Sequence, residues 1–173
     1  MKSKVVNFVF LLVLTLSSCN VKGDGFKSRL HTPNEEIDWY HRLGKTNFEK
    51  HWKDFNSINW EKEFWEEYES GRHNYSFIEV MDSLHNTYFS VSTLPLKDSF
   101  QYSLYVGNRS IIDDKGNEVE KGYVRCYLLN SNTPEKVKQF MKIFFKRNYD
   151  LFFSEISNLE VIFEVEDLYQ NID

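Results

Sequence analysis

The chain has 173 residues, with 26 acidic and 21 basic side chains and a net charge of −5 at neutral pH. An acidic surface argues against a nucleic acid partner, because clustered Lys and Arg side chains are what bind a phosphate backbone. It argues equally against electrostatic attraction to anionic lipid. The length suits one domain with its own core, to which the aromatic residues, 17% of the chain, bring large buried areas.

The N-terminus has the three parts of an export signal in the right order. Two lysines precede an apolar run over residues 5–16, which is shorter than the ~20 residues needed to span a bilayer. The run ends in Leu16-Ser17-Ser18-Cys19, and this segment resembles the lipobox of bacterial lipoproteins. The resemblance implies cleavage before Cys19 and acylation of its thiol. An ordinary secretory signal that ends in a cysteine is the alternative.

This resemblance divides the chain into a signal peptide (1–18), lipidated Cys19 with a tether (19–31), and a single globular domain (32–173). The mature part carries 19 basic and 26 acidic residues, a net charge of −7. The acyl chains are therefore the expected membrane contact. The expected location is the outer membrane, at its periplasmic face or at the cell surface. An envelope protein is the expected partner.

Helical signals fill the first part of the predicted domain. Thr32-Pro33-Asn34-Glu35 has the N-cap, first-turn proline and capping-box glutamate that predict a helix ending near Leu43. A second capping box begins at Thr46. Asn59 begins a third segment, in which aromatic residues recur every four positions until Gly71. We expect these aromatic stripes to face a core.

Between residues 75 and 130 the apolar period changes from helical to alternating. Four segments are rich in β-branched and aromatic residues: 77–80, 87–91, 100–106 and 122–129. Their short connections predict an antiparallel meander, because parallel pairs need long crossovers. The polar stretch 113–117 is interpreted as a hairpin tip. A calcium loop would need an oxygen ligand where Lys115 stands.

The last part of the chain predicts a helix and a strand. Thr133 and Pro134 begin an amphipathic helix that we expect to cover one face of the sheet. Residues 159–166 alternate apolar and acidic side chains and predict a final strand, with a helix through Leu168 as the alternative. The predicted fold is therefore α+β: N-terminal helices, an antiparallel meander of about four or five strands, and one amphipathic helix packed on the sheet.

The search for chemistry finds no catalytic, dinucleotide or phosphate-binding motif. No cofactor, metal site or catalytic residue is predicted. The five histidines lack metal-ligand spacing, and His51 is expected near a helix end or the surface. Cys126 lies in an alternating segment and is interpreted as a small core residue rather than a nucleophile.

Acidic residues are concentrated at the C-terminal end. Residues 148–173 contain seven acids and no Lys or Arg. They form either a solvated face of the domain or a surface that docks on a basic partner. The candidate partner-binding residues are Glu160, Glu164, Glu166 and Asp167.

Two functions fit these observations. The first is a non-catalytic lipoprotein that binds a partner protein, either as an accessory subunit or as a toxin-neutralising inhibitor. The second is a lipid-anchored hydrolase acting on cell-wall or surface glycan, with an acid pair drawn from the cluster at Glu63, Glu66, Glu67 and Glu69 and a histidine. A pocket in which Glu and His converge would favour the hydrolase, and an exposed aromatic patch would favour binding.

Overall fold

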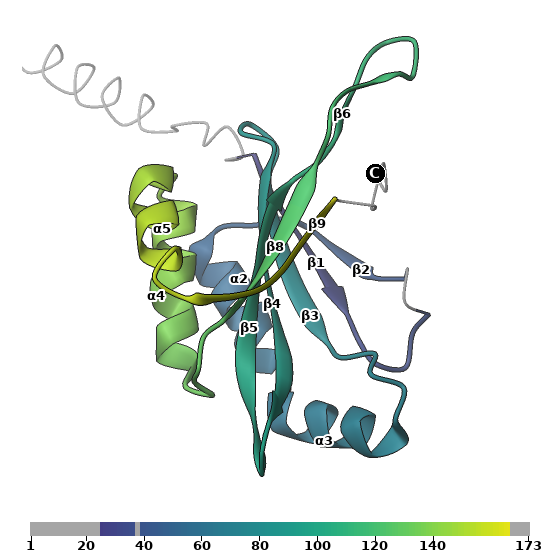
Figure 1. Ribbon diagram of the computed structural model, residues 1–173, viewed down its shortest axis with the longest axis vertical. Helices are drawn as coiled ribbons and strands as arrows, with labels where there is room; N and C mark the ends of the chain where they lie inside the picture. Colours follow the sequence, from purple (N-terminus) through teal and green to yellow (C-terminus); the bar gives the residue numbers. More distant parts are fainter. Residues whose placement is uncertain (1–24, 37–38, 167–173) are drawn as a thin grey trace, which may run out of the picture.

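A seven-stranded antiparallel sheet organises the protein, in the strand order β2-β1-β3-β4-β5-β8-β9 (Figure 1). The computed structural model describes residues 25–36 and 39–166. A separate two-stranded hairpin pairs β6 with β7. The α+β class is confirmed, with more strands than expected. The strands are β1 Phe26–His31, β2 His41–Lys45, β3 Phe77–Asp82, β4 Thr87–Leu96, β5 Ser99–Asn108, β6 Ile111–Ile112, β7 Glu118–Glu120, β8 Tyr123–Leu128 and β9 Glu160–Glu166.

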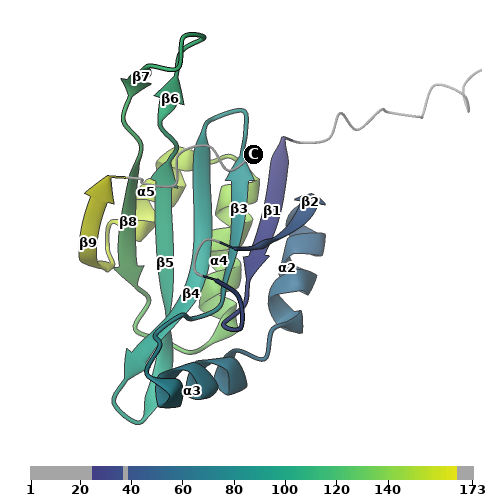
Figure 2. The same ribbon diagram turned by 90° about the vertical axis from the view of Figure 1, so that its right-hand side faces the viewer.

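In the part of the chain that the structure describes, helices cover only one face of this sheet (Figure 1). They are α2 Phe48–Ser57, α3 Trp60–Ser70, α4 Pro134–Phe145 and α5 Tyr149–Ile156. The helices α2, α4 and α5 lie on one side, and α3 lies near the β4–β5 end of the sheet (Figures 1 and 2). The prediction that the helix after Thr133 covers one face is confirmed. Within the described residues, no helix is long and apolar enough to cross a membrane.

Local capping fixes the helix ends much as predicted. The side chain of Asn47 accepts from the backbone N–H of Lys50 at 2.9 Å, so α2 begins one residue later than a Thr46 cap would place it. Asn59 caps α3, and Gly71 ends it with a φ of 70°, in the left-handed region that favours glycine.

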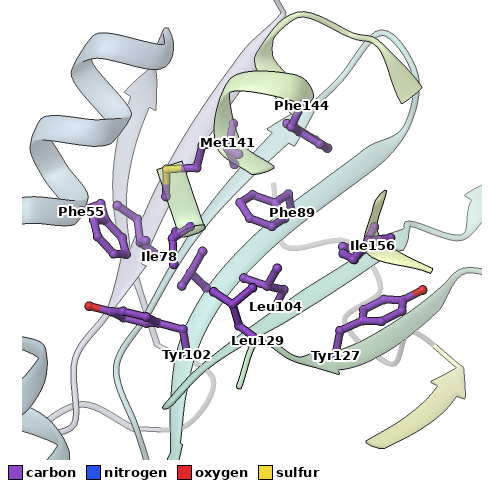
Figure 3. Close-up of a cluster of buried hydrophobic side chains, with 14 of the residues drawn as sticks. Phe55, Ile78, Phe89, Tyr102, Leu104, Tyr127, Leu129, Met141, Phe144 and Ile156 are labelled. Carbon is purple, nitrogen blue, oxygen red and sulfur yellow. The ribbon is translucent and has the colours of Figure 1, made fainter. Parts of the chain in front are cut away.

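The core lies between the sheet and its helical layer (Figure 3). Alternation along β4 turns Phe89 and Val91 toward the helices, and both are fully buried. Phe144 of α4 packs on Phe89, with ring centroids 5.7 Å apart, and on Phe152 of α5 at 5.4 Å. Full burial of each such ring stabilises the fold by about 2–3 kcal/mol. Many of the aromatic side chains of the sequence therefore lie in this core.

The domain begins earlier than expected, because residues 26–31 of the predicted tether form strand β1. This strand pairs with β2 on one side and β3 on the other, and Phe26 is 3% exposed. Only residues 20–25 then separate Cys19 from the sheet. Cys19 and the predicted signal peptide lie outside the described residues.

The predicted helix over residues 32–43 is wrong. Half of its capping box does form, since Glu35 accepts from the backbone N–H of Thr32 at 3.0 Å. However, the Asn74 amide donates to the carbonyls of Pro33 and Glu35, which a helix would need as its own acceptors. The chain turns instead and returns as β2 beside β1.

The second half of the chain contains the predicted last strand and hairpin tip, and one helix that was not predicted. Residues 160–166 form strand β9, so the strand prediction is confirmed over the helix. The polar stretch before β7 is a hairpin tip as expected, where Asp113 accepts from the backbone N–H groups of Lys115 and Asn117 at 2.8 Å. Helix α5 was not predicted. Asn148 caps it by accepting from the N–H of Leu151.

A buried carboxylate joins the sheet to the helical layer. Asp82, at the end of β3, is 0% exposed and accepts from Arg147 at 2.7 Å, Tyr149 at 2.6 Å and His85 at 2.8 Å. Burial by itself raises the pKa of Asp82, but these bonds and the Leu84 N–H outweigh burial and hold the pKa well below its usual range.

His51 is fully buried in α2, which corrects its expected place near the surface. Its Nδ1 lies 2.8 Å from the hydroxyl of Ser28, which itself donates to the carbonyl of Glu79. The Nδ1 is therefore the donor, and Nε2 is a buried acceptor with no hydrogen-bond partner in the described residues. Burial, with a smaller contribution from Lys50, lowers the pKa of His51 to about 3.

We expect His51 to make the protein acid-sensitive. Below about pH 6.5 the unfolded chain binds a proton at His51 that the folded protein does not bind until about pH 3. The free energy of unfolding should therefore fall with decreasing pH in this window, by up to about 1.4 kcal/mol per pH unit. Urea denaturation between pH 6.5 and 4 measures this slope. His51→Gln should remove most of it, and exposed His73→Asn should not; an unchanged slope in His51→Gln would contradict this assignment.

Candidate functional site

The face of the sheet opposite the helices carries a cavity of about 590 Å³. No helix of the described chain lies over this face (Figure 2). The same alternation that buries Phe89 and Val91 turns Tyr88, Ser90 and Ser92 of β4 toward the cavity. Its volume lies within the range of about 300–1,000 Å³ that is usual for small-ligand sites.

One row of cross-strand neighbours defines the chemistry of this face. Directly paired residues of adjacent strands turn their side chains to the same side of a sheet. The row therefore passes from charged residues on β1 and β3, through a small serine, to aromatic and apolar residues near β9. Across six strands it reads Arg29, Glu79, Ser90, Tyr105, Cys126 and Phe163.

The charged end of the row is a carboxylate held by two guanidinium groups. Glu79 is 5% exposed. Its Oε1 lies 2.7 Å from Nε of Arg29 and 3.0 Å from Nη2 of Arg109, and its Oε2 accepts from Nη2 of Arg29 at 3.0 Å. Both carboxylate oxygens of Glu79 are thus occupied by guanidinium groups.

Tyrosine rings hold both arginines in place. The guanidinium carbon of Arg29 lies 4.3 Å from the ring centroid of Tyr40, and that of Arg109 lies 4.5 Å from the ring centroid of Tyr88. Burial alone lowers the pKa of Arg29, but the neighbouring Glu79 carboxylate outweighs burial and raises it. Gly107 leaves room for Tyr88, because a Cβ at that position would come within 2.8 Å of the phenolic oxygen.

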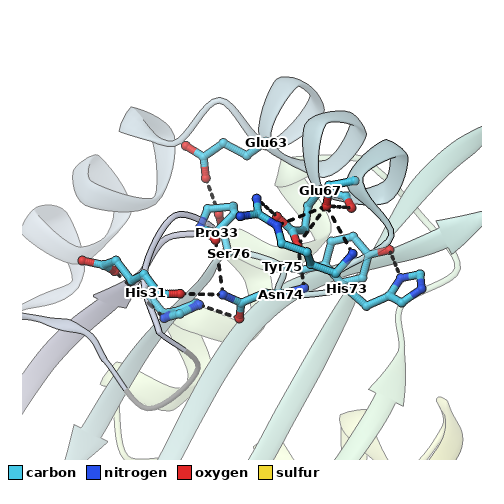
Figure 4. Close-up of polar contacts among 11 residues, drawn as sticks. His31, Pro33, Glu63, Glu67, His73, Asn74, Tyr75 and Ser76 are labelled. Carbon is cyan, nitrogen blue, oxygen red and sulfur yellow. Dashed lines mark hydrogen bonds and ion pairs between the residues drawn. The ribbon is translucent and has the colours of Figure 1, made fainter.

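A polar network forms the wall of the cavity between β1 and α3 (Figure 4). Buried His31 has Nδ1 2.6 Å from the carbonyl of Trp39 and Nε2 2.9 Å from Oδ1 of Asn74. The backbone N–H of Asn74 donates to the fully buried carboxylate of Glu67, which also binds Arg72 at 2.7 Å. The network has no pair of unengaged groups suited to acid and base catalysis.

The acid cluster proposed for glycan hydrolysis lies elsewhere. Glu63, Glu66 and Glu67 line a separate polar hollow of about 370 Å³, whose walls contain no histidine. Glu63 accepts a short hydrogen bond from Ser76, and Glu67 is engaged by Arg72. Within the described residues, no group of three or more His, Cys, Asp or Glu is placed to hold a metal ion.

The acidic residues predicted to bind a partner lie on the edge strand β9. Glu164 pairs with Arg125 of β8, and Glu166 pairs with Lys121 at 2.8 Å. Glu160 is exposed at the start of the strand. Asp167 lies outside the described residues. The described acids therefore lie along one edge of the sheet, and two of them pair with cations of β8 and of the segment before it.

Cys126 lies between Tyr105 and Phe163 in the row of cross-strand neighbours. It is 0% exposed, which confirms the small buried residue expected from the sequence. Burial raises the pKa of its thiol to about 11, against a smaller opposite effect of a hydrogen bond with Tyr105. A protonated, covered thiol is a poor nucleophile.

Sequence reasoning missed the charged cluster of the cavity. The sequence analysis placed Arg29 in the tether. It gave no role to Glu79, in a predicted strand, or to Arg109, in a predicted loop. One signal was present, since Glu79 is an acid between apolar residues in a strand predicted to be half-buried. A charge at such a position requires a partner, although no local pattern says which.

The chain matches no protein-family model, no curated protein and no solved structure. The functional assignment therefore depends on the geometry described above.

We predict that Cys126 is nearly inert toward thiol reagents in the folded protein. In a Cys19→Ser chain it is the one remaining thiol. A pKa of about 11 in place of 9 leaves roughly a hundredfold less thiolate at pH 8. Labelling with a chromogenic disulfide should be slower by at least that factor than in denaturing urea. Equal rates in the two conditions would show that the thiol is accessible.

Proposed function

We propose that the protein is a lipid-anchored envelope protein that binds a partner protein through strand β9 and catalyses no reaction. The observation that supports this proposal is the exposure of apolar side chains on β9. All seven of its residues are exposed, although four of them are apolar: Val161, Ile162, Phe163 and Val165, each 40–49% exposed.

Strand β9 is the last strand of the sheet, paired with β8 on one side. Among the described residues, no strand pairs with its other side. An exposed apolar edge presents unpaired backbone N–H and C=O groups, and such edges are recognised by addition of an extended segment from a partner. The apolar side chains of β9 add area to that recognition.

A second copy of the chain is a poor occupant of this edge. An antiparallel pair centred on Phe163 would place Glu160 opposite Glu166, and like charges in that position repel. A partner segment that alternates Lys or Arg with apolar residues has the complementary pattern. The pairs of Glu164 with Arg125 and Glu166 with Lys121 are exposed and therefore weak, so partner cations can share these acids.

The proposed anchor would hold the domain close to the bilayer. Residues 20–25 reach about 20 Å when extended, from ~3.3 Å per residue. That is roughly half the reach expected when the tether was taken to continue to residue 31. An anchored domain of this kind meets partners that lie in or near the same membrane.

The hydrolase alternative has less support. Glu and His residues do line the large cavity, but the oxygens of Glu79 are held by two arginines and the nitrogens of His31 by two acceptors. General acid and base catalysis needs a carboxyl group free to exchange a proton with the substrate.

The anchor is tested by Cys19→Ser. This change should move the protein from the membrane fraction to the soluble fraction and abolish labelling by an alkyne analogue of palmitate, because the acceptor thiol is gone. Cys126→Ser, at the buried thiol, is the matched control and should alter neither result. Retention of label in Cys19→Ser would refute lipidation at this cysteine.

The docking edge is tested by photo-crosslinking in the native host, with a benzophenone amino acid at Val161 or Ile162. Exposed Val119, on the β7 hairpin, is the control position. We expect β9-specific products with one partner, mapping to an extended segment that contains Lys or Arg. Glu160→Lys should weaken them. Products equal to those from Val119, or a product with a second copy of the chain, would refute the proposal.

A further inference from the structure

The two sides of the sheet carry opposite charges. The outer strand β9 has exposed Glu160, Glu164 and Glu166. On the other side, Lys27 of β1 lies directly opposite Lys45 of β2, and both side chains are exposed. Directly paired residues turn to the same face of a sheet, and like charges in that position repel. The net acidity of the chain therefore conceals a local basic surface.

Neither of these lysines is neutralised within the described chain. Among the described residues, no carboxylate pairs with Lys27 or Lys45, whereas the exposed lysines Lys50 and Lys121 have one each. Lysine on an outer strand also discourages unwanted strand pairing, but Lys27 lies on β1, an inner strand. An anionic surface would offset the repulsion between the two ammonium groups.

An exposed leucine projects beside these lysines. Leu84, in the turn between β3 and β4, is 70% exposed, the highest value among the large apolar side chains of the described residues. Its backbone N–H donates to the buried carboxylate of Asp82 at 3.0 Å. The N–H of Ser83 donates to the carbonyl of Gly25 at 2.9 Å, which ties the turn to the start of β1. The exposed leucine is thus held in a fixed place.

Gly25 brings both features next to the proposed anchor, because it ends the tether from Cys19 and directly precedes β1. Its φ of 76° is in the left-handed region, and a Cβ there would come within 2.9 Å of Cγ of Leu84, so glycine permits this close approach. Lys27 lies two residues further on. A tether that reaches about 20 Å therefore presents this corner of the domain to the bilayer.

The acidic parts of the protein lie away from this corner. Strand β9 is separated from β1 by β3, β4, β5 and β8, which at ~4.8 Å per strand places it about 24 Å away. The β6–β7 hairpin, with Asp113 and Asp114 at its tip, rises on the β8 side of the sheet rather than above β1 (Figure 2). A membrane below the β1 side would therefore not meet these acids.

We infer that this corner rests on an anionic bilayer surface, with Leu84 among the lipid headgroups and Lys27 and Lys45 against lipid phosphates. The inference deepens the proposed function and rests on its lipid anchor. One leucine and two lysines bind weakly by themselves, but the anchor gives them a high effective concentration of lipid. The consequence is orientation, because β9 is then held on the side away from the membrane, where a partner can reach it.

Photo-crosslinking to lipid tests this orientation on the mature chain, coupled through the Cys19 thiol to maleimide lipid in vesicles of phosphatidylcholine and phosphatidylglycerol. Buried Cys126 does not compete for coupling. A diazirine amino acid replaces Leu84 or, as the control, Leu96, an exposed leucine at the far end of β4. Position 84 should give at least about fivefold more lipid adduct than position 96, the preference expected for one lysine at an anionic surface.

The combined change Lys27→Gln and Lys45→Gln should lower the adduct at position 84 about fivefold or more, because each lysine contributes to attraction. Omitting phosphatidylglycerol should have the same effect. The matched control is Lys97→Gln with Lys136→Gln. These exposed lysines lie after β4 and at the start of α4, away from Gly25, and their loss should leave the adduct unchanged.

Equal adducts at positions 84 and 96 would overturn the inference. An adduct at position 84 that depends on neither phosphatidylglycerol nor the two lysines would overturn it as well, because proximity to the tether alone would explain it. The lipid comparison needs no lysine variant, so it decides the question even if one fails to fold. Coupling is chemical, so the result is independent of acylation in the cell and of docking at β9.

Discussion

The buried carboxylate of Asp82 ties the two layers of this protein together. It lies at the end of β3 and accepts from Arg147, which lies between α4 and α5, and from Tyr149, the first residue of α5. A buried charge without partners is strongly unfavourable, so this site specifies where the α4–α5 pair meets the sheet. Once those helices cover one face, the opposite face is left without a helical cover in the described chain, and the cavity and the exposed edge follow from that asymmetry.

The two faces of the sheet use the same alternation for opposite purposes. On the helical face the strands present Phe89, Val91 and Leu104, which pack to full burial. On the open face their neighbours are Ser90, Ser92 and Tyr105, which leave a hollow. The partly buried Arg29–Glu79–Arg109 cluster is expected to stabilise the fold no more than well-packed apolar side chains of similar size would.

The proposed partner edge and the proposed membrane contact lie on opposite sides of the sheet. Strand β9 is one outer strand, and β2, which pairs Lys45 with Lys27 of β1, is the other. A lipid surface at the β1 side would leave β9 open to a partner. The two surfaces are therefore chemically distinct, one acidic and apolar, the other basic with one projecting leucine.

The sequence alone determined the elements whose signals are local. Asn47, Asn59 and Gly71 act within one turn of their own helices, and the alternation of residues 77–129 and 159–166 marks strands wherever they pair. Tertiary structure decided the rest, because the competing interactions come from far along the chain. Asn74 takes the carbonyls that a helix after Thr32 would need, β1 becomes a strand only beside β3, and the cavity joins residues 29, 79 and 109. Long-range pairing leaves no periodic mark in the segments that it joins, and for that reason the sequence could not place the site.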